Sequence, residues 1–218
     1  MEIFNLPHTT KVGRVIPKNA FDAYTNTKLK KLFTDLVARI TWTNKLSADT
    51  VRLEGKEIKE IQLFKIELKK KEDVQGVMDV IDKAIPYNIV FVVVHGAEMY
   101  FSTSLKHPHP LNEDNSVIDW TFKSDWFNAD ENKYTLNLKK TLDAVFHDLC
   151  LQLSGRQDFS GRPIQELIEY KKQVDTLEKE IAKLKSNITR AKQYKDKVAL
   201  NLRLKEFEKE LLLLEGKG

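Results

Sequence analysis

The chain contains few of the residues that build cofactor loops, disulfide frameworks or membrane spans. Only eight of its 218 residues are glycine. No glycine-rich loop and no Gly-x-Ser-x-Gly turn is present, which excludes the common nucleotide-binding and hydrolase fingerprints, and we expect no cofactor. The single cysteine, Cys150, excludes an internal disulfide framework and fits a reducing compartment. It lies in an apolar helical pattern without a catalytic motif around it, so we expect a buried thiol rather than a nucleophile.

Long apolar runs are also missing. No segment approaches the roughly 18 apolar residues that a membrane-spanning helix needs. The first residues, MEIFNLPHTTKVGRVIPK, contain no continuous hydrophobic segment of the kind that a secretion signal requires. We therefore expect a cytoplasmic protein without membrane contact.

Charge of neither sign dominates the sequence, whose formal net charge is +4. From Pro163 onward there are 13 Lys/Arg against 10 Asp/Glu, a net charge of +3, which leaves +1 for the first 162 residues. Neither part has the basic excess of a dedicated nucleic-acid-binding domain, so nucleic acid stays open as a partner. A charged fraction of 31% with a hydrophobic fraction of 41% favours a normal core joined to a long solvated element.

Residues 1–155 alternate between helical and strand patterns, as is typical of an α/β domain. The segment 89–95 is the most apolar in the chain and predicts a central strand that is covered on both faces. A strand before it, a helix between them and hairpins after it predict a mixed sheet with a crossover connection. The expected helices lie at 29–40, 74–84 and 142–154, and the expected strands at 40–47, 89–95, 98–105 and 117–127. Residues 50–70 supply one or two further strands, with a turn at Gly55-Lys56.

A linker at 156–163, which contains Gly161 and Pro163 and directly follows Gly155, separates this domain from a highly charged segment. Residues 164–215 contain neither glycine nor proline and predict one helix of roughly 50 residues, or about 75 Å. The apolar frame shifts near 193–201, which a stutter or a helical hairpin would produce; because no breaker marks a turn, we favour one long coiled-coil helix. The predicted seam is Leu167, Val174, Leu177, Ile181, Leu184, Ile188, Leu204, Phe207 and Leu211.

Such a helix alone in water would expose its apolar stripe, so it needs a partner. The two candidates are a second copy of the chain, giving a homo-oligomer, and a different protein. An association role through this segment is the firmest functional prediction that the composition permits.

The stretch IQLFKIELKKKED contains a candidate catalytic triplet, Glu67-Leu68-Lys69. On a strand, Glu67 and Lys69 project to the same face, as a nuclease of restriction-endonuclease-like fold requires. There, Glu67 and a second carboxylate would hold Mg²⁺ while Lys69 assists the attacking water. Asp49 is the candidate second ligand, although it lacks the usual proline-aspartate context. The plainer interpretation is a solvated or partner-facing strand surface.

Other chemistry-bearing residues lack companions. His107 and His109 share a proline-rich loop, but no third ligand completes a metal site. Trp120, Lys123 and Trp126 have the composition of a base-stacking surface, and equally that of two core tryptophans. The lysine run at 69–71 leads directly into Glu72 and Asp73, which weakens its attraction for phosphate.

Six segments together resemble an uncharacterised prokaryotic and phage family that is catalogued as domain of unknown function 4391. They are IFNLPHTTKVGRVIPKNAFDAY, EIQLFKIELKKKE, VIDKAIPYNIVFVV, FKSDWF, LDAVFHDLCLQLSG and KQYKDKVALNLRLKEFEKEL. The resemblance covers nearly the whole chain in order. It implies genes beside helicases and DNA methyltransferases of restriction-modification or phage-defence type, and hence such proteins as partners. It implies no catalytic residues.

Two functional hypotheses follow. The first is a non-catalytic interaction and assembly protein with an α/β recognition domain and a coiled coil that oligomerises or docks onto a partner. The second is a Mg²⁺-dependent nuclease that uses Glu67, Lys69 and Asp49. The discriminating observation is whether a carboxylate from another strand lies within about 5 Å of Glu67, close enough to share one Mg²⁺.

Overall fold

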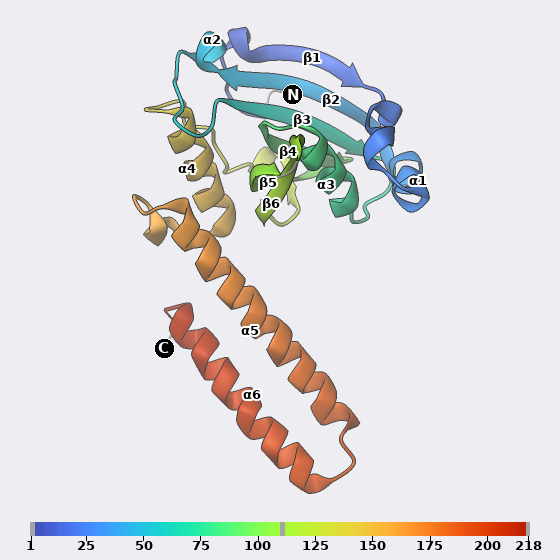
Figure 1. Ribbon diagram of the computed structural model, residues 1–218, viewed down its shortest axis with the longest axis vertical. Coiled ribbons are helices and arrows are strands. Elements are labelled where there is room, and N and C mark those ends of the chain that lie inside the picture. Colours follow the sequence, from blue (N-terminus) through green and yellow to red (C-terminus); the bar gives the residue numbers. More distant parts are fainter. Residues whose placement is uncertain (1–2, 110–111, 217–218) are drawn as a thin grey trace. The chain divides into compact units, whose positions relative to one another are not determined.

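The computed structural model describes residues 3–109 and 112–216. It divides into two compact units, Met1–Ser160 and Gly161–Gly218. The first unit contains the whole sheet and the second contains two long helices (Figure 1).

The first unit is built on a seven-stranded mixed sheet. Its strands are β1 (Lys11–Ile16), β2 (Val37–Ser47), β3 (Glu60–Leu68), β4 (Asn88–His95), β5 (Glu98–His109), β6 (Asn112–Lys123) and β7 (Phe127–Asn128). They lie in the order β1-β2-β3-β4-β5-β6, and β7 pairs with β5. Only the β3–β4 pair is parallel, among the strand pairs that the structure describes. The predicted mixed α/β sheet with β4 inside it is therefore confirmed.

The helices of the first unit connect and cover these strands. They are α1 (Thr27–Leu36), α2 (Ala48–Val51), α3 (Gln75–Ala84), α4 (Leu142–Ser154) and the short 3₁₀ turns η1 (His8–Thr10), η2 (Lys18–Tyr24), η3 (Ala129–Glu131) and η4 (Gln157–Phe159). The helix α3 is the crossover between the parallel strands β3 and β4. Its end before Pro86 follows from the poor fit of helical geometry to a residue that precedes proline.

The main core lies between one face of the sheet and helices α1 and α3. On β3, Phe64, Ile66 and Leu68 alternate with Lys65 and Glu67, and the three apolar side chains are buried in this core. Because successive strand residues point to opposite faces, the lysine and the glutamate are left on the other face of the sheet. The alternation in the sequence thus places the candidate triplet away from α3.

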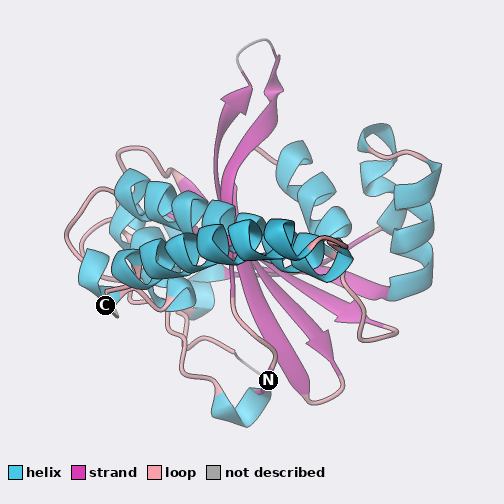
Figure 2. Cartoon of the chain, turned by 90° about the horizontal axis from the view of Figure 1, so that it is seen from below, coloured by secondary structure: helices cyan, strands magenta, loops and turns pink. Residues whose placement is uncertain are grey.

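The β5–β6 hairpin is longer than the sequence pattern predicts. Residues 106–116 were expected to form a loop, but most of them extend β5 and β6, and Figure 2 shows the hairpin projecting beyond the rest of the sheet. Lys106 supplies a reason for the extra length. Its side chain is buried and its Nζ donates hydrogen bonds of 2.7 Å to the carbonyl oxygens of Asp82 and Ile85 at the end of α3.

The strand β1 stands at one end of the strand order and pairs with β2, so it forms an edge of the sheet among the described residues. Its register shifts between Lys11 and Arg14, and Gly13 at the irregularity has a φ of +69°. A left-handed conformation of this kind strains residues that carry a Cβ, and it breaks the regular pairing pattern of the strand.

The second unit corrects the prediction of one long helix. It contains α5 (Ile164–Arg190) and α6 (Tyr194–Leu214), joined by residues 191–193 and folded back as a hairpin (Figure 1). The chain leaves the helix at Ala191, where ψ is 128°, although neither glycine nor proline is present. Folding back lets the two apolar stripes cover each other, which a single straight helix cannot do without a partner.

Candidate functional site

The glutamate of the predicted triplet lies beside cations. The Nζ of Lys65 donates a 2.8 Å hydrogen bond to Oε1 of Glu67, and both side chains are about one-third exposed. In the sheet register Glu67 stands opposite Arg39 on β2 and Val94 on β4. Its neighbours on the two adjoining strands are therefore a guanidinium group and an aliphatic side chain.

No neighbouring strand supplies a companion carboxylate. Neither β2 nor β4 contains an aspartate or a glutamate. Asp49 lies in α2 beyond Ser47, which pairs with Glu60 at the opposite end of β3 from Glu67. Glu60 and Glu67 are seven steps, or about 23 Å, apart along the strand, whereas two ligands of one Mg²⁺ lie within about 5 Å. The structure does not bring the predicted metal ligands Asp49 and Glu67 together.

Lys69 has a different neighbourhood from Glu67. The strand ends at Leu68, and the Nζ of Lys69 donates a 2.6 Å hydrogen bond to the carbonyl oxygen of Thr34 in the last turn of α1. Its backbone N–H donates to Leu36 O, 2.7 Å away. A cation at a helix C-terminus is favoured by the helix dipole. The pKa of Lys18 is lowered by burial and by the positive charge of Lys69, so this corner holds two cations. The Glu-x-Lys triplet is thus divided between two locations.

In place of a metal centre, the face that carries Lys65 contains two adjoining cavities of about 490 Å³ and 500 Å³. Lys65 and Ile3 line both of them, so together they form one trough across the sheet, which we call the arm groove. The first cavity is lined by Ile3, Phe4, Leu6, Pro7, His8, Lys11, Gly13, Thr43, Asn44, Leu63, Lys65 and Val92, and the second by Ile3, Lys65, Val94, Gly96, Ala97, Met99, Asn128, Ala129 and Asp130.

An aromatic cluster holds the N-terminal arm over this groove. The ring of Phe4 lies 5.1 Å from that of Phe101 on β5, which in turn lies 5.4 Å from both Phe127 and Tyr134. Asn132 Nδ2 adds a 3.1 Å hydrogen bond to the carbonyl oxygen of Ile3. Tilted aromatic contacts at these distances contribute roughly 0.5–1.5 kcal/mol each beyond the area they bury. The arm is therefore anchored, and the groove beneath it is preformed.

The charge of the groove is asymmetric. His8, Lys11 and Lys65 line the cavity at the β1 end without a carboxylate among the lining residues, and Asp130 is the acidic lining residue of the other cavity. The floor between them is aliphatic. Cavities of 300–1,000 Å³ with a few placed polar groups are the usual size for ligand sites. The arrangement suits a ligand or segment with an anionic group at the β1 end.

The aromatic and lysine residues that were candidates for base stacking do not form one surface. Trp126 packs edge-on against Tyr100 with a centroid distance of 4.7 Å, and Nζ of Lys123 lies 4.4 Å above the Tyr100 ring. Trp120 is on the opposite face of β6 from Lys123, since three positions separate them, so the three residues do not share a stacking surface.

The buried thiol and the histidines likewise show no site. Cys150 is buried, which raises the pKa of its thiol, in agreement with an inert core residue. Nδ1 of His107 lies 3.0 Å from Oδ2 of Asp119, while the side chain of His109 is outside the described residues. Within residues 3–109 and 112–216, no group of three or more His, Cys, Asp or Glu side chains is placed to hold a metal ion.

The sequence patterns did not reveal a buried ion pair between α3 and β5. Nζ of Lys106 lies 3.0 Å from Oδ1 of Asp82, and both side chains are almost fully buried. Burial lowers the pKa of Lys106 and raises that of Asp82, and each charge opposes the shift of the other. Lys106 comes immediately before His107 in a segment whose pattern predicts a loop, so the sequence gives no sign that its side chain is buried.

The second unit holds the predicted seam residues on the facing sides of two helices. Ile181 and Leu184 on α5 are buried, whereas Val174, Leu177 and Ile188 on α5 and Leu204, Phe207 and Leu211 on α6 are half-buried. Leu167 lies in the first turn of α5. The ion pair of Lys185 with Glu208, 3.0 Å long, joins the two helices. Lys172, Gln173, Thr176, Leu177, Glu210, Leu213 and Leu214 line a groove of about 510 Å³ between them.

The comparisons with known proteins give a family and no further relatives. The family model described as "Domain of unknown function (DUF4391)" matches residues 4–211, and the chain belongs to this family. The search of curated proteins found no match, and neither did the search of solved structures. In the described part of the chain, no helix combines the length and the apolar character that crossing a membrane requires.

Proposed function

We propose that the protein is a non-catalytic interaction and assembly protein of a phage-defence or restriction-modification type system in the cytoplasm. Its α/β unit recognises an anionic partner, nucleic acid in the first instance, through the arm groove. Its helical hairpin, packed in the coiled-coil manner, joins the chain into an oligomer or onto a larger complex such as one containing a helicase or methyltransferase. The defence setting rests on the family resemblance alone.

One observation carries the recognition half of the proposal. Lys65, which lines both cavities, is bonded to Glu67, and the two strands beside Glu67 supply no second carboxylate. Divalent-metal catalysis of phosphodiester cleavage needs acidic ligands that converge on one ion. A trough with Lys11 and Lys65 at its β1 end, an aliphatic floor and Asp130 in its other cavity instead favours binding of an anion at the β1 end, without turnover.

The nuclease alternative keeps one point in its favour, which is the strand order. The β1–β2–β3 meander followed by the crossover helix α3 and the parallel strand β4 is compatible with a restriction-endonuclease-like fold. The alternative would use Glu67 as the metal ligand with Lys69 and Asp49. We place it second because these three side chains belong to three separate neighbourhoods.

The two functions are separated by measuring binding and cleavage in one sample. Fluorescein-labelled 20-nucleotide single strands and duplexes are titrated with the full chain, with and without Mg²⁺, and the DNA is then run on a denaturing gel. We expect binding without cleavage, and a loss of affinity of about tenfold, or about 1.4 kcal/mol, in Lys65→Glu. The matched control Lys28→Glu makes the same change of net charge at an exposed position of α1 outside the groove.

The outcomes are distinct. Cleavage that requires Mg²⁺ and is lost in Glu67→Ala would establish the nuclease and end this proposal. Equal weakening by Lys65→Glu and Lys28→Glu would show binding through net charge alone, without a role for the groove. Absence of DNA binding by the parent chain would contradict nucleic acid as the partner.

A further inference from the structure

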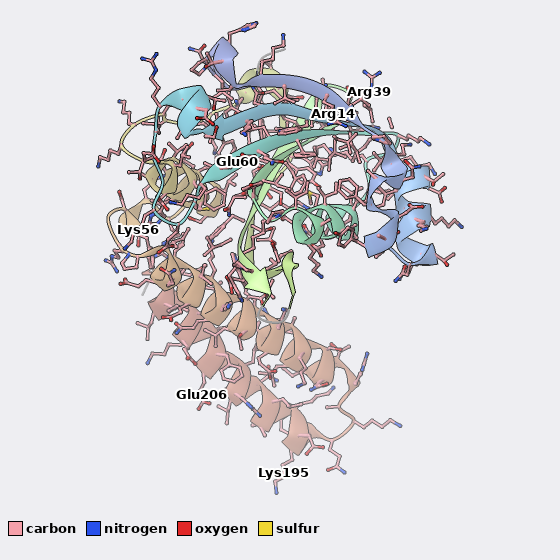
Figure 3. The ribbon with its side chains drawn as sticks, turned by 45° about the horizontal axis from the view of Figure 1, so that its top comes forward. Arg14, Arg39, Lys56, Glu60, Lys195 and Glu206 are labelled. Carbon is pink, nitrogen blue, oxygen red and sulfur yellow. The ribbon has the colours of Figure 1, made fainter. Side chains whose placement is uncertain are left out.

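The outer side of α6 carries an apolar stripe that the hairpin leaves uncovered. Leu202 and Leu213 are 60% and 62% exposed, and Val198 is 42% exposed. At 100° per residue these three side chains lie at least a third of a turn around α6 from Leu204 and Leu211, which face α5, and Leu213 is at the border of the groove between the two helices. Figure 3 shows Lys195 and Glu206 on this same outer side. The stripe therefore reads, along the helix, Lys195, Val198, Leu202, Glu206, Lys209 and Leu213.

The hairpin is also strongly polarised in charge. The half that contains the turn, residues 179–205, has nine Lys/Arg and two Asp/Glu, a net charge of +7. The half at the open end, residues 164–178 and 206–216, has three Lys/Arg and eight Asp/Glu, a net charge of −5. Because α5 and α6 run in opposite directions, each end of the hairpin places like charges side by side. Within one copy, opposite charges of the two halves meet in the ion pairs of Lys179 with Asp175 and of Lys185 with Glu208.

The apolar stripe and the charge distribution both match those of a second copy of the hairpin that runs in the opposite direction. Reversing the direction places the basic half of one copy beside the acidic half of the other, and the relation holds in both directions, as a two-fold axis demands. In a parallel pair the like halves would face each other and repel. The charge pattern thus selects a second copy of this chain, in antiparallel orientation, as the occupant of the stripe.

We propose that the protein forms a two-fold symmetric dimer in which the outer stripes of two α6 helices pack antiparallel. Leu202 of one copy lies opposite Leu213 of the other, and the same register brings Glu206 opposite Lys209. A shift of four residues would bring Glu206 close to its own symmetry mate, an arrangement that like charges disfavour. This inference rests on the assembly half of the proposed function and names its partner.

The groove beside Leu213 has room for Leu202 of the second copy. Leu213 also lines the groove of about 510 Å³ between α5 and α6, together with Leu177 and Leu214. Leu202 of the second copy, placed against Leu213, lies at the edge of this apolar groove. Glu206 and Lys209 have no ion-pair partner within the described residues, so both are available for pairing across the dimer.

The test is charge reversal on the full chain, followed by sedimentation equilibrium between about 5 and 100 µM. Glu206→Lys places a lysine opposite Lys209 of the partner, and Lys209→Glu places a glutamate opposite Glu206. Each variant alone is expected to dimerise at least tenfold more weakly than the parent chain. A one-to-one mixture of the two variants restores opposite charges at both positions and is expected to regain the parent affinity.

Direction is read from cross-linking with a short bismaleimide. In the antiparallel register, a mixture of Leu202→Cys and Leu213→Cys chains gives a cross-linked dimer, whereas either variant alone gives far less. The native thiol of Cys150 is buried, and the parent chain serves as the blank for it. Efficient self-linking of Leu202→Cys would show parallel helices and overturn the proposal.

A matched pair of substitutions distinguishes the loss of a dimer contact from the loss of folding. Leu202→Asp is expected to weaken the dimer at least tenfold. Leu212→Asp is expected to leave the dimer intact, because Leu212 is 47% exposed but lies about a quarter turn from the stripe. A parent chain that is monomeric at 100 µM overturns the inference. So does equal dimerisation of parent, Glu206→Lys and Lys209→Glu. None of these outcomes affects the DNA measurements that decide the proposed function.

Discussion

At the scale of single residues, Asp143 stabilises a distant loop, a role that its position in a helical sequence pattern does not indicate. Its carboxylate accepts backbone N–H bonds from Lys56, Glu57 and Ile58 at 2.6, 2.9 and 3.0 Å. It thereby holds the loop before β3 from a position more than eighty residues away in the chain. Gly55 belongs to the same contact, since a Cβ there would stand 1.9 Å from the carbonyl oxygen of Ile58.

We predict that Asp143→Asn destabilises the first unit by about 1–2 kcal/mol at pH 7. Charged acceptors contribute roughly 1.5–3 kcal/mol per bond when buried, and partial solvent exposure of this site reduces the total. The measurement is urea unfolding followed by tryptophan fluorescence. All three tryptophans, Trp42, Trp120 and Trp126, precede residue 160, so the signal reports on this unit.

The pH dependence of the difference in unfolding free energy between the parent chain and Asp143→Asn is a control. Burial raises the pKa of Asp143, but hydrogen bonds from the backbone N–H groups of Ile58, Glu57, Lys56 and Asp143 itself outweigh it, and the pKa in the folded protein is lowered. A carboxyl group with a lowered folded pKa contributes stability above its unfolded pKa of about 3.9 and loses it as the pH falls through the folded value. The gap between parent and Asp143→Asn is therefore expected to shrink below pH 4. A gap of the same size at pH 3 and pH 7 would contradict this account.

The buried pair of Lys106 and Asp82 gives a second prediction at this scale. Lys106→Met leaves the Asp82 carboxylate buried without its cation, which costs about 3–5 kcal/mol. Lys106→Met combined with Asp82→Leu removes both charges and is expected to lose less than Lys106→Met alone. Urea unfolding of the two variants makes the comparison. If the double variant is the less stable one, the carboxylate is not the source of the loss.

At the scale of elements, the hairpin of α5 and α6 depends on its half-covered seam. Ile181→Asp with Leu184→Asp places two carboxylates at buried positions in the middle of α5, within the seam. We expect a loss of helical circular dichroism at 222 nm of the size that the second unit contributes, with unchanged tryptophan fluorescence. Lys179→Asp with Lys183→Asp, at exposed positions of the same helix, is the control and is expected to keep the signal.

Elements with strong patterns could be predicted, and the turn in the hairpin could not. The continuous apolar run of β4 is buried only in a central strand, and the apolar stripe of α1 is buried only on one face of a helix. Each pattern therefore predicts one kind of element. Residues 191–193 carry no glycine or proline, so nothing local distinguishes a stutter in a long helix from a reversal of direction. The choice is made by packing between side chains that lie far apart in the sequence, such as Lys185 and Glu208.

At the scale of the whole molecule, the candidate site shows why sequence reasoning reached only part of it. Alternation along β3 is enough to put Lys65 and Glu67 on one face of the sheet, as their ion pair requires. The arm groove could not be predicted, because its roof comes from residues 3–8 and its far wall from residues 128–130. No period or motif connects these segments. They meet through the aromatic cluster of Phe4, Phe101, Phe127 and Tyr134.

The irregular strand β1 has a consequence for how copies of the molecule can associate. A regular edge strand invites another strand to pair with it, and repetition of that event gives an open-ended fibre. The left-handed Gly13 and the register shift between Lys11 and Arg14 interrupt the row of backbone groups that such pairing needs. Growth of the sheet from molecule to molecule is blocked at this edge. The dimer proposed above uses the helical unit instead, where a two-fold contact ends with a pair.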